Sequence, residues 1–420
     1  MKRMFLIILT LLIIVSCDIV SAVSTDEPEK QEIVKNKYFE PILLTKAQER
    51  IAQESNAFGL GVFAELMSDY ATTVGKDLVI SPLSLSSALS MCVNGAEGRT
   101  KEQMLDVLGY EGFTIEEMNS YYDIMLDALV RADEKVDFLS ANSVWHEKDV
   151  LLYEEYKENL ANVFDASVNE VESLSDEAVI HAINEWCSDK TNGKIENFLE
   201  EGQDDGDVKL INALYFGGEW TTEFEKPISL TFNHETGTVS RLETVTGIRT
   251  LEYVENESFK LVEIPYGNSA FVMDFILPQE GLSIAGAAAD LDMDVLSDMF
   301  ASLTEDIVKL QFPVFEIEYG KEMTQVLMDM GMTSPFLDAD FSKMSPTDMV
   351  ISSVMQKSYI NVSEKGTEAA SVTDVTLEDA FAPEESGAGV KIRNFIADRP
   401  FFFMIRESST GVILFIGKKA

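Results

Sequence analysis

Three histidines are the first residues to consider, because histidine is the usual general base in hydrolases. They are His146, His181 and His234, and none of them lies near a Gly-x-Ser-x-Gly nucleophile elbow. The chain has no His-Glu-x-x-His pair, no cysteines paired at metal-ligand spacing and no glycine-rich phosphate loop. The sequence therefore predicts no catalytic residue, no metal site and no cofactor, and we do not expect an enzyme.

The most informative stretch runs from 363 to 373 and reads SEKGTEAASVT. At period two, one face is uncharged and the other carries all three carboxylates of 367–378, as in a strand with one buried face. The uncharged face consists of Thr367, Ala369, Ser371, Thr373, Val375 and Leu377. The following residues, 378–389, are acidic and contain Pro383 and two glycines, which indicates an exposed loop. The segment therefore combines features of a buried strand and of a loop, unless it is an ordinary edge strand that leads into a loop.

The segment from 364 to 370, EKGTEAA, closely resembles the hinge of the serpins, a family of loop-inserting protease inhibitors. Further segments resemble serpins in the same order along the chain, so that the resemblance covers roughly 45–420. It implies an α+β fold in one large domain, with a central mixed β-sheet, flanking helices and an exposed reactive loop at about 364–398. In that family the cleaved loop enters the central sheet as an additional strand.

The resemblance also assigns site residues. The hinge would consist of Glu364, Gly366, Thr367, Glu368, Ala369, Ala370 and Ser371. Glycine supplies a pivot without a Cβ atom, and the small residues after it can pass between two strands. The region where the sheet opens would contain Ser81, Ser84, Asn212, Trp220 and Gln356. The family usually has histidine where this chain has Gln356, whose amide can bridge two elements but does not titrate.

The reactive bond follows from the same resemblance. Serpins are cut about fourteen residues after the hinge glycine, which from Gly366 gives Ala380–Phe381. Alanine before the bond suits elastase-like proteases, whereas a shift of one residue puts Phe381 there and favours chymotrypsin-like ones. The segment between Ala380 and Pro400 is longer than usual, so a later bond near Ser386–Gly387 stays open.

The elements that must position these residues are visible as periodic patterns. Ser81 followed by Pro82 predicts the start of a helix. Thr100 with Gln103 predicts a second helix that begins with a capping box. Further helices are predicted at 46–67, 116–131, 180–186 and 323–332, and strands at 78–80, 139–145, 209–216, 263–267, 271–278, 312–317, 354–362, 401–405 and 412–416. Asn212 is polar within an apolar strand, so we expect it to have hydrogen-bond partners.

Composition limits the kind of partner. The chain of 420 residues has 73 acidic and 32 basic residues, a formal net charge of −41. Such a charge repels nucleic acid and anionic membranes. The helix predicted at 116–131 is acidic where many heparin-binding serpins are basic, so we expect no activation by a polyanion. Cys92 and Cys187 lie in apolar helical patterns and are expected to be buried free thiols.

The N-terminus resembles an export signal. Lys2 and Arg3 precede an apolar run of about twelve residues, which is too short to span a bilayer. The end of this run, IVSC, resembles a bacterial lipobox in which Cys17 carries lipid. Residues 1–16 would then be a signal peptide, 17–43 a lipidated tether and 44–420 the serpin domain. Ordinary cleavage after Ala22 is the alternative.

These observations together predict an inhibitor of serine endopeptidases, with cysteine endopeptidases as a second class. The target would be elastase-like or chymotrypsin-like, because no Lys or Arg lies between Lys365 and Lys391 to suit a trypsin-like enzyme. We expect a covalent complex with the protease and a monomeric inhibitor, bound to a membrane only through its N-terminal lipid, on the periplasmic or outer surface, or secreted. The alternative is a non-inhibitory serpin that acts as a binding or chaperone-like protein.

Overall fold

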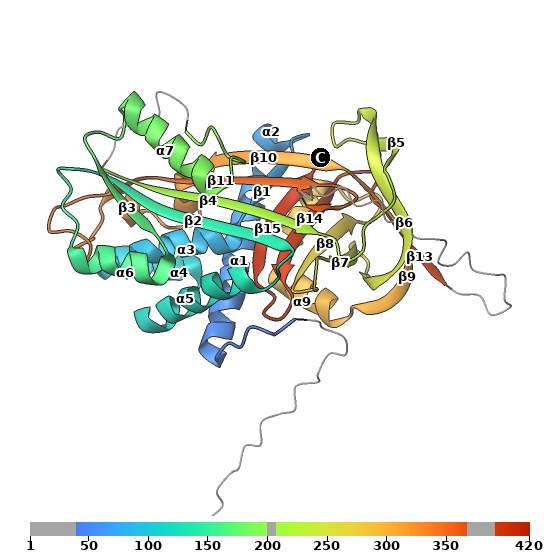
Figure 1. Cartoon of the computed structure of the whole chain (residues 1–420), viewed down its shortest axis with the longest axis horizontal. Coiled ribbons are helices and arrows are strands. Elements are labelled where there is room, and N and C mark those ends of the chain that lie inside the picture. Colours follow the sequence, from blue (N-terminus) through green and yellow to red (C-terminus); the bar gives the residue numbers. More distant parts are fainter. Residues whose placement is uncertain (1–38, 200–206, 368–390) are drawn as a thin grey trace, which may run out of the picture. The chain divides into compact units, whose positions relative to one another are not determined.

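Two β-sheets with helices packed on them make up the described chain (Figure 1). The structure is a computed structural model that describes residues 39–199, 207–367 and 391–420. These residues belong to one compact unit that runs from Lys37 to Ala420. The α+β fold predicted from the sequence is confirmed.

The helices lie mainly in the N-terminal half of the chain. They are α1 (Lys46–Ser68), α2 (Tyr70–Thr73), α3 (Pro82–Val93), α4 (Gly98–Leu108), α5 (Ile115–Arg131), α6 (Glu154–Phe164), α7 (Glu177–Lys190), α8 (Ile284–Ala289), α9 (Met293–Ala301), α10 (Thr324–Asp329) and α11 (Ser334–Leu337).

The strands form two sheets. The central sheet has six strands in the order β10-β11-β12-β4-β2-β3: β10 (Phe315–Glu322), β11 (Ile351–Val362), β12 (Gly366–Thr367), β4 (Val208–Glu219), β2 (Val136–Glu147) and β3 (Ser167–Val171). The second sheet has nine strands, ordered β1-β15-β14-β8-β7-β6-β9-β13 with β5 paired to β6: β1 (Leu78–Ile80), β15 (Ile413–Lys419), β14 (Phe401–Glu407), β8 (Phe271–Pro278), β7 (Phe259–Pro265), β6 (Val239–Glu255), β9 (Thr304–Pro313), β13 (Ile392–Ile396) and β5 (Ile228–Asn233).

The central sheet is mixed, as predicted. β11 runs parallel to β4, whereas β10 pairs antiparallel with β11, and β2 antiparallel with β4. β4 is buried at every position except its last, Glu219, as expected of a strand covered on both faces.

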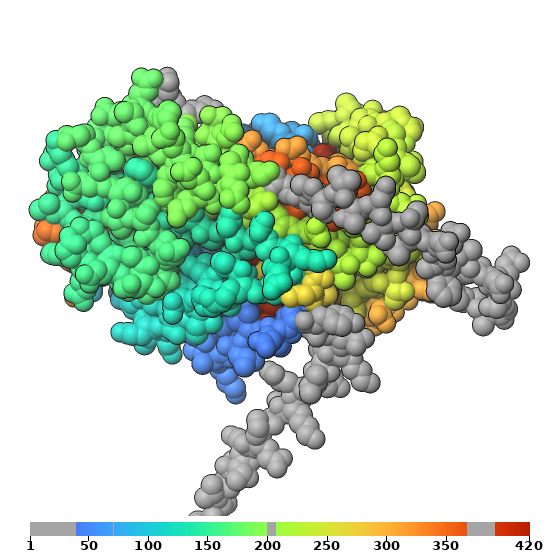
Figure 2. All heavy atoms as spheres, in the orientation of Figure 1, coloured from blue at the N-terminus to red at the C-terminus, as the bar shows by residue number. Residues whose placement is uncertain are grey.

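One face of the central sheet rests on the main core and the other on a smaller core under α7. On the first side lies α3, a helix that is buried at all of its 12 positions. On the second side Ile183 and Cys187 of α7 join a cluster with Ile211 and Tyr215 of β4. In Figure 2 the green atoms of α7 and its neighbours cover one part of this face. Any strand added between β4 and β11 therefore has to pass between two packed layers.

One local prediction was wrong, and another differs in where the strand begins. α4 begins at Gly98, so Thr100 and Gln103 lie inside the helix and form no capping box. The hydroxyl of Thr100 instead accepts a hydrogen bond from the backbone N–H of Asp340, and the Gln103 side chain accepts one from that of Ser334. The run 312–317 opens a strand, as expected, but that strand, β10, begins only at Phe315, because the preceding strand β9 extends to Pro313.

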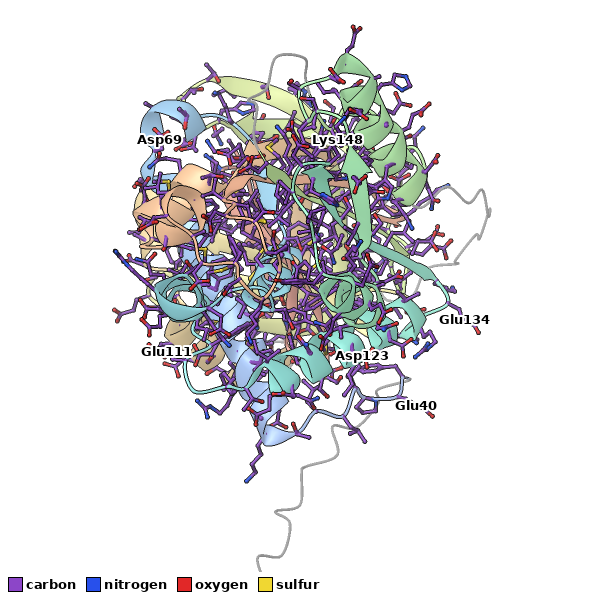
Figure 3. The ribbon with its side chains drawn as sticks, turned by 90° about the vertical axis from the view of Figure 1, so that its left-hand side faces the viewer. Glu40, Asp69, Glu111, Asp123, Glu134 and Lys148 are labelled. Atoms are coloured by element: carbon purple, nitrogen blue, oxygen red, sulfur yellow. The ribbon has the colours of Figure 1, made fainter. Side chains whose placement is uncertain are left out.

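The outer surface is acidic on many sides. Glu40, Asp69, Glu111, Asp123 and Glu134 are exposed and lie around the periphery of the ribbon in Figure 3. Within the described ranges, no helix is long and apolar enough to cross a membrane. Cys92 and Cys187 are buried free thiols, as predicted, and burial raises the pKa of both.

Candidate functional site

The central feature of the site is the line along which β4 and β11 meet. The two strands pair directly in parallel from the start of β11 up to Tyr359, which lies opposite Tyr215. Beyond that point β12 lies between them. Thr367 pairs with Val362 of β11 and with Gly218 of β4, and Gly366 pairs with Glu219. The first residues of the predicted loop are thus strand residues of the central sheet before any cleavage.

Gln356 ties β11 to the start of α3, where the two strands are still directly paired. Its side-chain oxygen accepts a hydrogen bond from the backbone N–H of Ser81 at 3.0 Å, and its nitrogen donates to the Ser81 carbonyl at 3.0 Å. The Ser81 hydroxyl in turn caps α3 by accepting from the backbone N–H of Ser84 at 3.2 Å. The amide that replaces the usual histidine therefore bridges a strand and a helix.

Asn212 lies directly opposite Gln356 in the parallel ladder. Its side-chain nitrogen donates to the Asn142 side chain on β2 at 2.8 Å, so the expected partner exists on one side. Its oxygen has no hydrogen-bond partner among the described residues, and neither has the hydroxyl of Ser84 or Ser358. A buried polar atom left unpaired costs about 1–3 kcal/mol. The closed junction between β4 and β11 therefore contains unsatisfied polar atoms.

Trp220 lies apart from the other residues of the predicted sheet-opening region. It is eight residues beyond Asn212 along the same chain segment, about 26 Å at the rise of a strand. Its ring nitrogen donates to the carbonyl of Ser363 at 2.9 Å, and its ring stacks on Tyr266 with centroids 4.4 Å apart. The predicted residues thus form two groups, one at mid-strand and one beside β12.

The hinge is a tight turn bound to the segment after β4. The backbone N–H of Ser363 donates to the Gly366 carbonyl at 2.8 Å, which closes the turn. The backbone N–H of Trp220 donates to the carbonyl of Lys365, and that of Phe224 donates to the carbonyl of Glu364, each at 2.9 Å. Two backbone hydrogen bonds therefore hold the turn on the segment that follows β4.

Gly366 and Thr367 are both buried within the sheet. Gly366 has a φ of +148°, and a Cβ atom there would lie 2.0 Å from the carbonyl oxygen of Gly218. Thr367 has 0% of its surface exposed and lies on the inward face that the alternation assigns to it. Its hydroxyl is 2.6 Å from the hydroxyl of Tyr266.

The remaining predicted site residues lie outside the described residues. They are the hinge residues Glu368, Ala369, Ala370 and Ser371, the reactive bond Ala380–Phe381 with its alternative at Ser386–Gly387, and the lipidation site Cys17. Their roles stay predictions.

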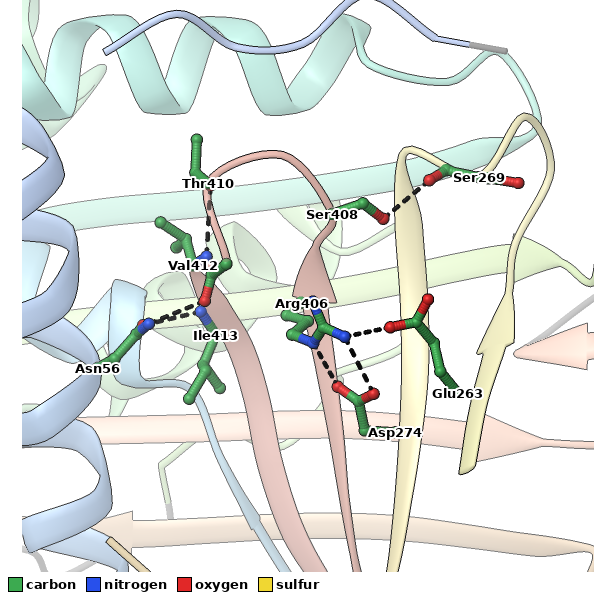
Figure 4. Close-up of polar contacts among 10 residues, drawn as sticks. Asn56, Glu263, Ser269, Asp274, Arg406, Ser408, Thr410, Val412 and Ile413 are labelled. Carbon is green, nitrogen blue, oxygen red and sulfur yellow. Dashed lines mark hydrogen bonds and ion pairs between the residues drawn. The ribbon is translucent and has the colours of Figure 1, made fainter. Parts of the chain in front are cut away.

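Sequence reasoning missed Tyr266 and a buried charge cluster shown in Figure 4. Arg406 of β14 donates to the carboxylate of Asp274 on β8 at 2.6 Å and also contacts Glu263 of β7. Its guanidinium lies 4.2 Å from the ring centroid of Phe300. Burial, together with Glu263, raises the pKa of Asp274 to about 6 although Arg406 lowers it. Asp274 and Glu263 stand inside apolar strands, so the only sequence signal was a charge in an apolar run.

The three histidines are not brought together. His146 lies on β2, His181 on α7 and His234 after β5, where its ring contacts the carbonyl of Ala420 and the hydroxyl of Ser240. Within the part of the chain that the structure describes, no group of His, Cys, Asp or Glu could hold a metal ion.

Comparison with known proteins agrees with this geometry. A family model described as "Serpin (serine protease inhibitor)" matches residues 53–420. An uncharacterized serpin-like protein of Methanosarcina acetivorans is 30% identical over 380 residues, which is 88% of this chain and 85% of that protein. Serpin B11 of Mus musculus is 31% identical over 394 residues, with 88% of this chain and 99% of the relative covered.

Solved structures show the same fold. The thermophilic serpin tengpin, in its native state, has a TM-score of 0.79 and 28% sequence identity, with 90% of this chain and 95% of tengpin covered. Human thyroxine-binding globulin in complex with its ligand has a TM-score of 0.78 and 21% identity over 89% of this chain and 98% of that one. At that identity the second likeness concerns the fold alone.

Proposed function

The chain belongs to the serpin family, and from this premise we propose that it inhibits serine endopeptidases, with cysteine endopeptidases as a second class of target. Serpins are in general protease inhibitors rather than enzymes, so a protease is the kind of partner that the family has. In this proposal the protease cleaves the loop, stays covalently attached, and is trapped when the loop enters the central sheet between β4 and β11.

The observation that supports inhibition is the position of β12. A loop that must enter a sheet needs small, uncharged residues on its inward face, because a buried unpaired charge costs several kcal/mol. Thr367, the first residue of that face, is fully buried between β4 and β11. A bulky or charged residue at this position would favour the non-inhibitory alternative.

Ala380–Phe381 is the proposed reactive bond, which gives an elastase-like or chymotrypsin-like target. The test is incubation with one protease of each kind, with a trypsin-like protease as the matched control, followed by a denaturing gel. We expect a denaturant-stable complex with at least one of the first two and none with the control. Mass spectrometry of the released C-terminal fragment should give a start at residue 381, or at 382 for the shifted bond.

A non-inhibitory serpin is the second candidate. Thyroxine-binding globulin was solved with thyroxine, so a protein of this fold can bind a small molecule. The same gel separates the two candidates. If every protease simply cuts the loop and no stable complex forms, the inhibitory proposal fails and a binding role gains support.

We further propose that the chain is exported and anchored through Cys17, and that it works as a monomer without a polyanion activator. The support is the N-terminal pattern and the exposed acidic face of α5, with Glu116, Asp123 and Asp127. Expression of the full chain in a bacterial host should place it in the membrane fraction, and Cys17→Ser should release it. Equal fractionation of both proteins would contradict the anchor.

A further inference from the structure

The two hydroxyls of Tyr266 and Thr367 form a buried pair. They lie 2.6 Å apart, and both residues have 0% of their surface exposed. Either oxygen can be the donor. A buried hydroxyl without a partner is costly, so each of these groups has a strong preference for the other. The contact therefore fixes where the Thr367 side chain can lie.

The Tyr266 ring has little freedom of its own. It stacks on Trp220 with an interplanar angle of 19°, and Phe216 packs against it edge-on with centroids 5.1 Å apart. Its backbone forms an isolated bridge with Trp220, and its N–H donates to the carbonyl of Phe271 at 2.9 Å. Aromatic contacts of this kind restrict a ring to one orientation. The hydroxyl is thus held at one point beside β12.

This contact connects the two sheets. Tyr266 directly follows β7 of the nine-stranded sheet, whereas Thr367 belongs to β12 of the central sheet. β12 itself has only two residues, and one ladder partner on each side for Thr367. So short a strand gains little from its own ladder, which makes an additional side-chain bond important for keeping it in place.

We propose that Tyr266 is a positioning residue for loop insertion: its hydroxyl keeps Thr367 between β4 and β11, so that insertion extends an existing strand and does not have to start a new one. This inference rests on the proposed inhibitory function. The first residues of a new strand lose conformational entropy before many hydrogen bonds have formed to offset it. In the resting protein this entropy has already been lost, because Thr367 is in place. Insertion can then outpace hydrolysis of the bond that links the protease to the loop.

Tyr266→Phe is the decisive variant, because it removes the hydroxyl and keeps the ring. We expect it to raise the ratio of loop-cleaved inhibitor to trapped protease complex by about fivefold, the size expected for one hydrogen bond. Amide hydrogen exchange of a peptide that spans 363–367 should become faster. Tyr156→Phe is the matched control, since that tyrosine is also buried and hydrogen-bonded, to the Met91 carbonyl at 3.1 Å on another element.

Variants at the partner separate positioning from simple packing. Thr367→Ser keeps a hydroxyl and should behave like the parent protein, whereas Thr367→Val should resemble Tyr266→Phe. The double variant Tyr266→Phe with Thr367→Val should be no worse than either single variant, because no hydroxyl is then left buried alone. If Tyr266→Phe lowers the melting temperature but changes neither stoichiometry nor exchange relative to Tyr156→Phe, the proposal is overturned.

The two proposals can fail independently. Absence of any complex with the unaltered protein would refute inhibition. The exchange comparison needs no protease, so a faster exchange of 363–367 in Tyr266→Phe would still support the positioning role, and equal exchange in both variants would refute it.

Discussion

Gly366 lies directly against the backbone of β4. A Cβ atom at this position would meet the backbone of β4, 2.0 Å from the oxygen of Gly218 and 2.7 Å from the Cα of Glu219, and its φ of +148° is unfavourable for other residues. Backbone atoms of a central strand cannot shift as a side chain can. The residue therefore fixes whether β12 can lie between its neighbours.

Gly366→Ala should expel β12 from the sheet. We expect faster hydrogen exchange of 363–367 and conversion of the inhibitor into a substrate, seen as a loss of the stable protease complex on a denaturing gel. Gly320→Ala on β10 is the control, because a Cβ atom there makes only ordinary contact with Lys357 at 3.4 Å. Unchanged exchange in Gly366→Ala would mean that the turn at 363–366 tolerates a side chain.

Asp274 should make the stability depend on pH in an unusual direction. Burial raises its pKa from 3.8 to about 6, so between these values the folded state binds the proton and the unfolded state does not. The unfolding free energy contributed by this group is therefore full below about pH 4 and is lost as the pH rises through 6, by about 3 kcal/mol at most. Most paired carboxylates show the opposite trend.

Asp274→Asn removes this titration, since the amide stays neutral and can still accept a bond from Arg406. In urea titrations the stability of the variant relative to the parent should increase as the pH is raised from 5 to 7.5. Asp137→Asn, at an exposed position of β2, is the control, because it makes the same chemical change away from Arg406. A pH-independent difference between Asp274→Asn and the parent would show that Asp274 is ionised throughout, paired with Arg406.

The hydrogen-bond partners of individual side chains could not be predicted from the sequence. The alternation at 367–377 correctly indicated that Thr367 faces inward, because strand periodicity is local. The partner of the Asn212 side chain is Asn142, 70 residues earlier, and the partner of Thr367 is Tyr266, 101 residues earlier. Such pairs depend on which strands become neighbours in one sheet and on how two sheets meet, which no local pattern encodes.

At the scale of elements, β13 holds the far end of the loop segment. It is a strand of five residues that, among the described strands, pairs only with β9, in parallel, at the edge of the nine-stranded sheet. Arg393 strengthens this edge: it donates to Asp306 of β9 at 2.9 Å, contacts Glu255 of β6 at 3.2 Å and lies over the ring of Tyr253. One side chain thus joins β13 to its partner β9 and to one further strand, β6.

Arg393→Ala should loosen β13 without unfolding the protein. We expect several-fold faster hydrogen exchange of 391–397, with unchanged exchange in β4 and β11. Arg241→Ala is a suitable control, because Arg241 is exposed and bonds only within the β5–β6 hairpin, to Ser229. High salt should reduce the effect, because it screens partly exposed ion pairs. Equal hydrogen exchange of 391–397 in both variants would mean that the backbone hydrogen bonds to β9, and not Arg393, hold β13 in place.

Helices and strands were predicted well where the signal is a local pattern. They were predicted poorly where a side chain forms hydrogen bonds to residues far away in the sequence. Ser81 and Pro82 start α3 as expected, since cap and proline act within one turn. Thr100 and Gln103 have the residue types of a capping box but bind Asp340 and Ser334. The long-range contact outcompeted the local one, and α4 starts two residues earlier.

At the scale of the whole molecule, we expect a further strand between β4 and β11 to stabilise the central sheet. β12 runs antiparallel to both β4 and β11, which are themselves parallel where they touch. Extension of β12 would replace the parallel junction with two antiparallel ladders, and antiparallel pairing is slightly more stable per residue. It would also reach the unsatisfied oxygen of Asn212 and hydroxyl of Ser358. We therefore expect the sheet with an extended β12 to be more stable than the resting one.

The observed register identifies which loop residue would reach Asn212. Thr367 pairs with Gly218 and with Val362. Six residues further along each strand, an extended β12 would place Thr373 between Asn212 and Gln356. Thr373 lies outside the described residues, but in the sequence it belongs to the same uncharged face as Thr367. Its hydroxyl could then supply the hydrogen bond that the Asn212 oxygen lacks, and Ser371 would come opposite Ser358 in the same way.

Loop-cleaved protein should therefore melt far above the intact form, and Thr373 should contribute to the difference. Thr373→Val keeps the shape of the side chain and removes the hydroxyl, so it should lower the melting temperature of the cleaved form by about 1–2 °C, the shift that about 1 kcal/mol produces in a domain of this size. The intact form should be unaffected, as should both forms of Thr376→Val, which alters the outward face. Equal melting of cleaved and intact parent protein would refute the metastable resting state. A drop in Thr376→Val but not in Thr373→Val would instead show that the strand enters one residue out of the register seen at β12, since such a shift exchanges the two faces.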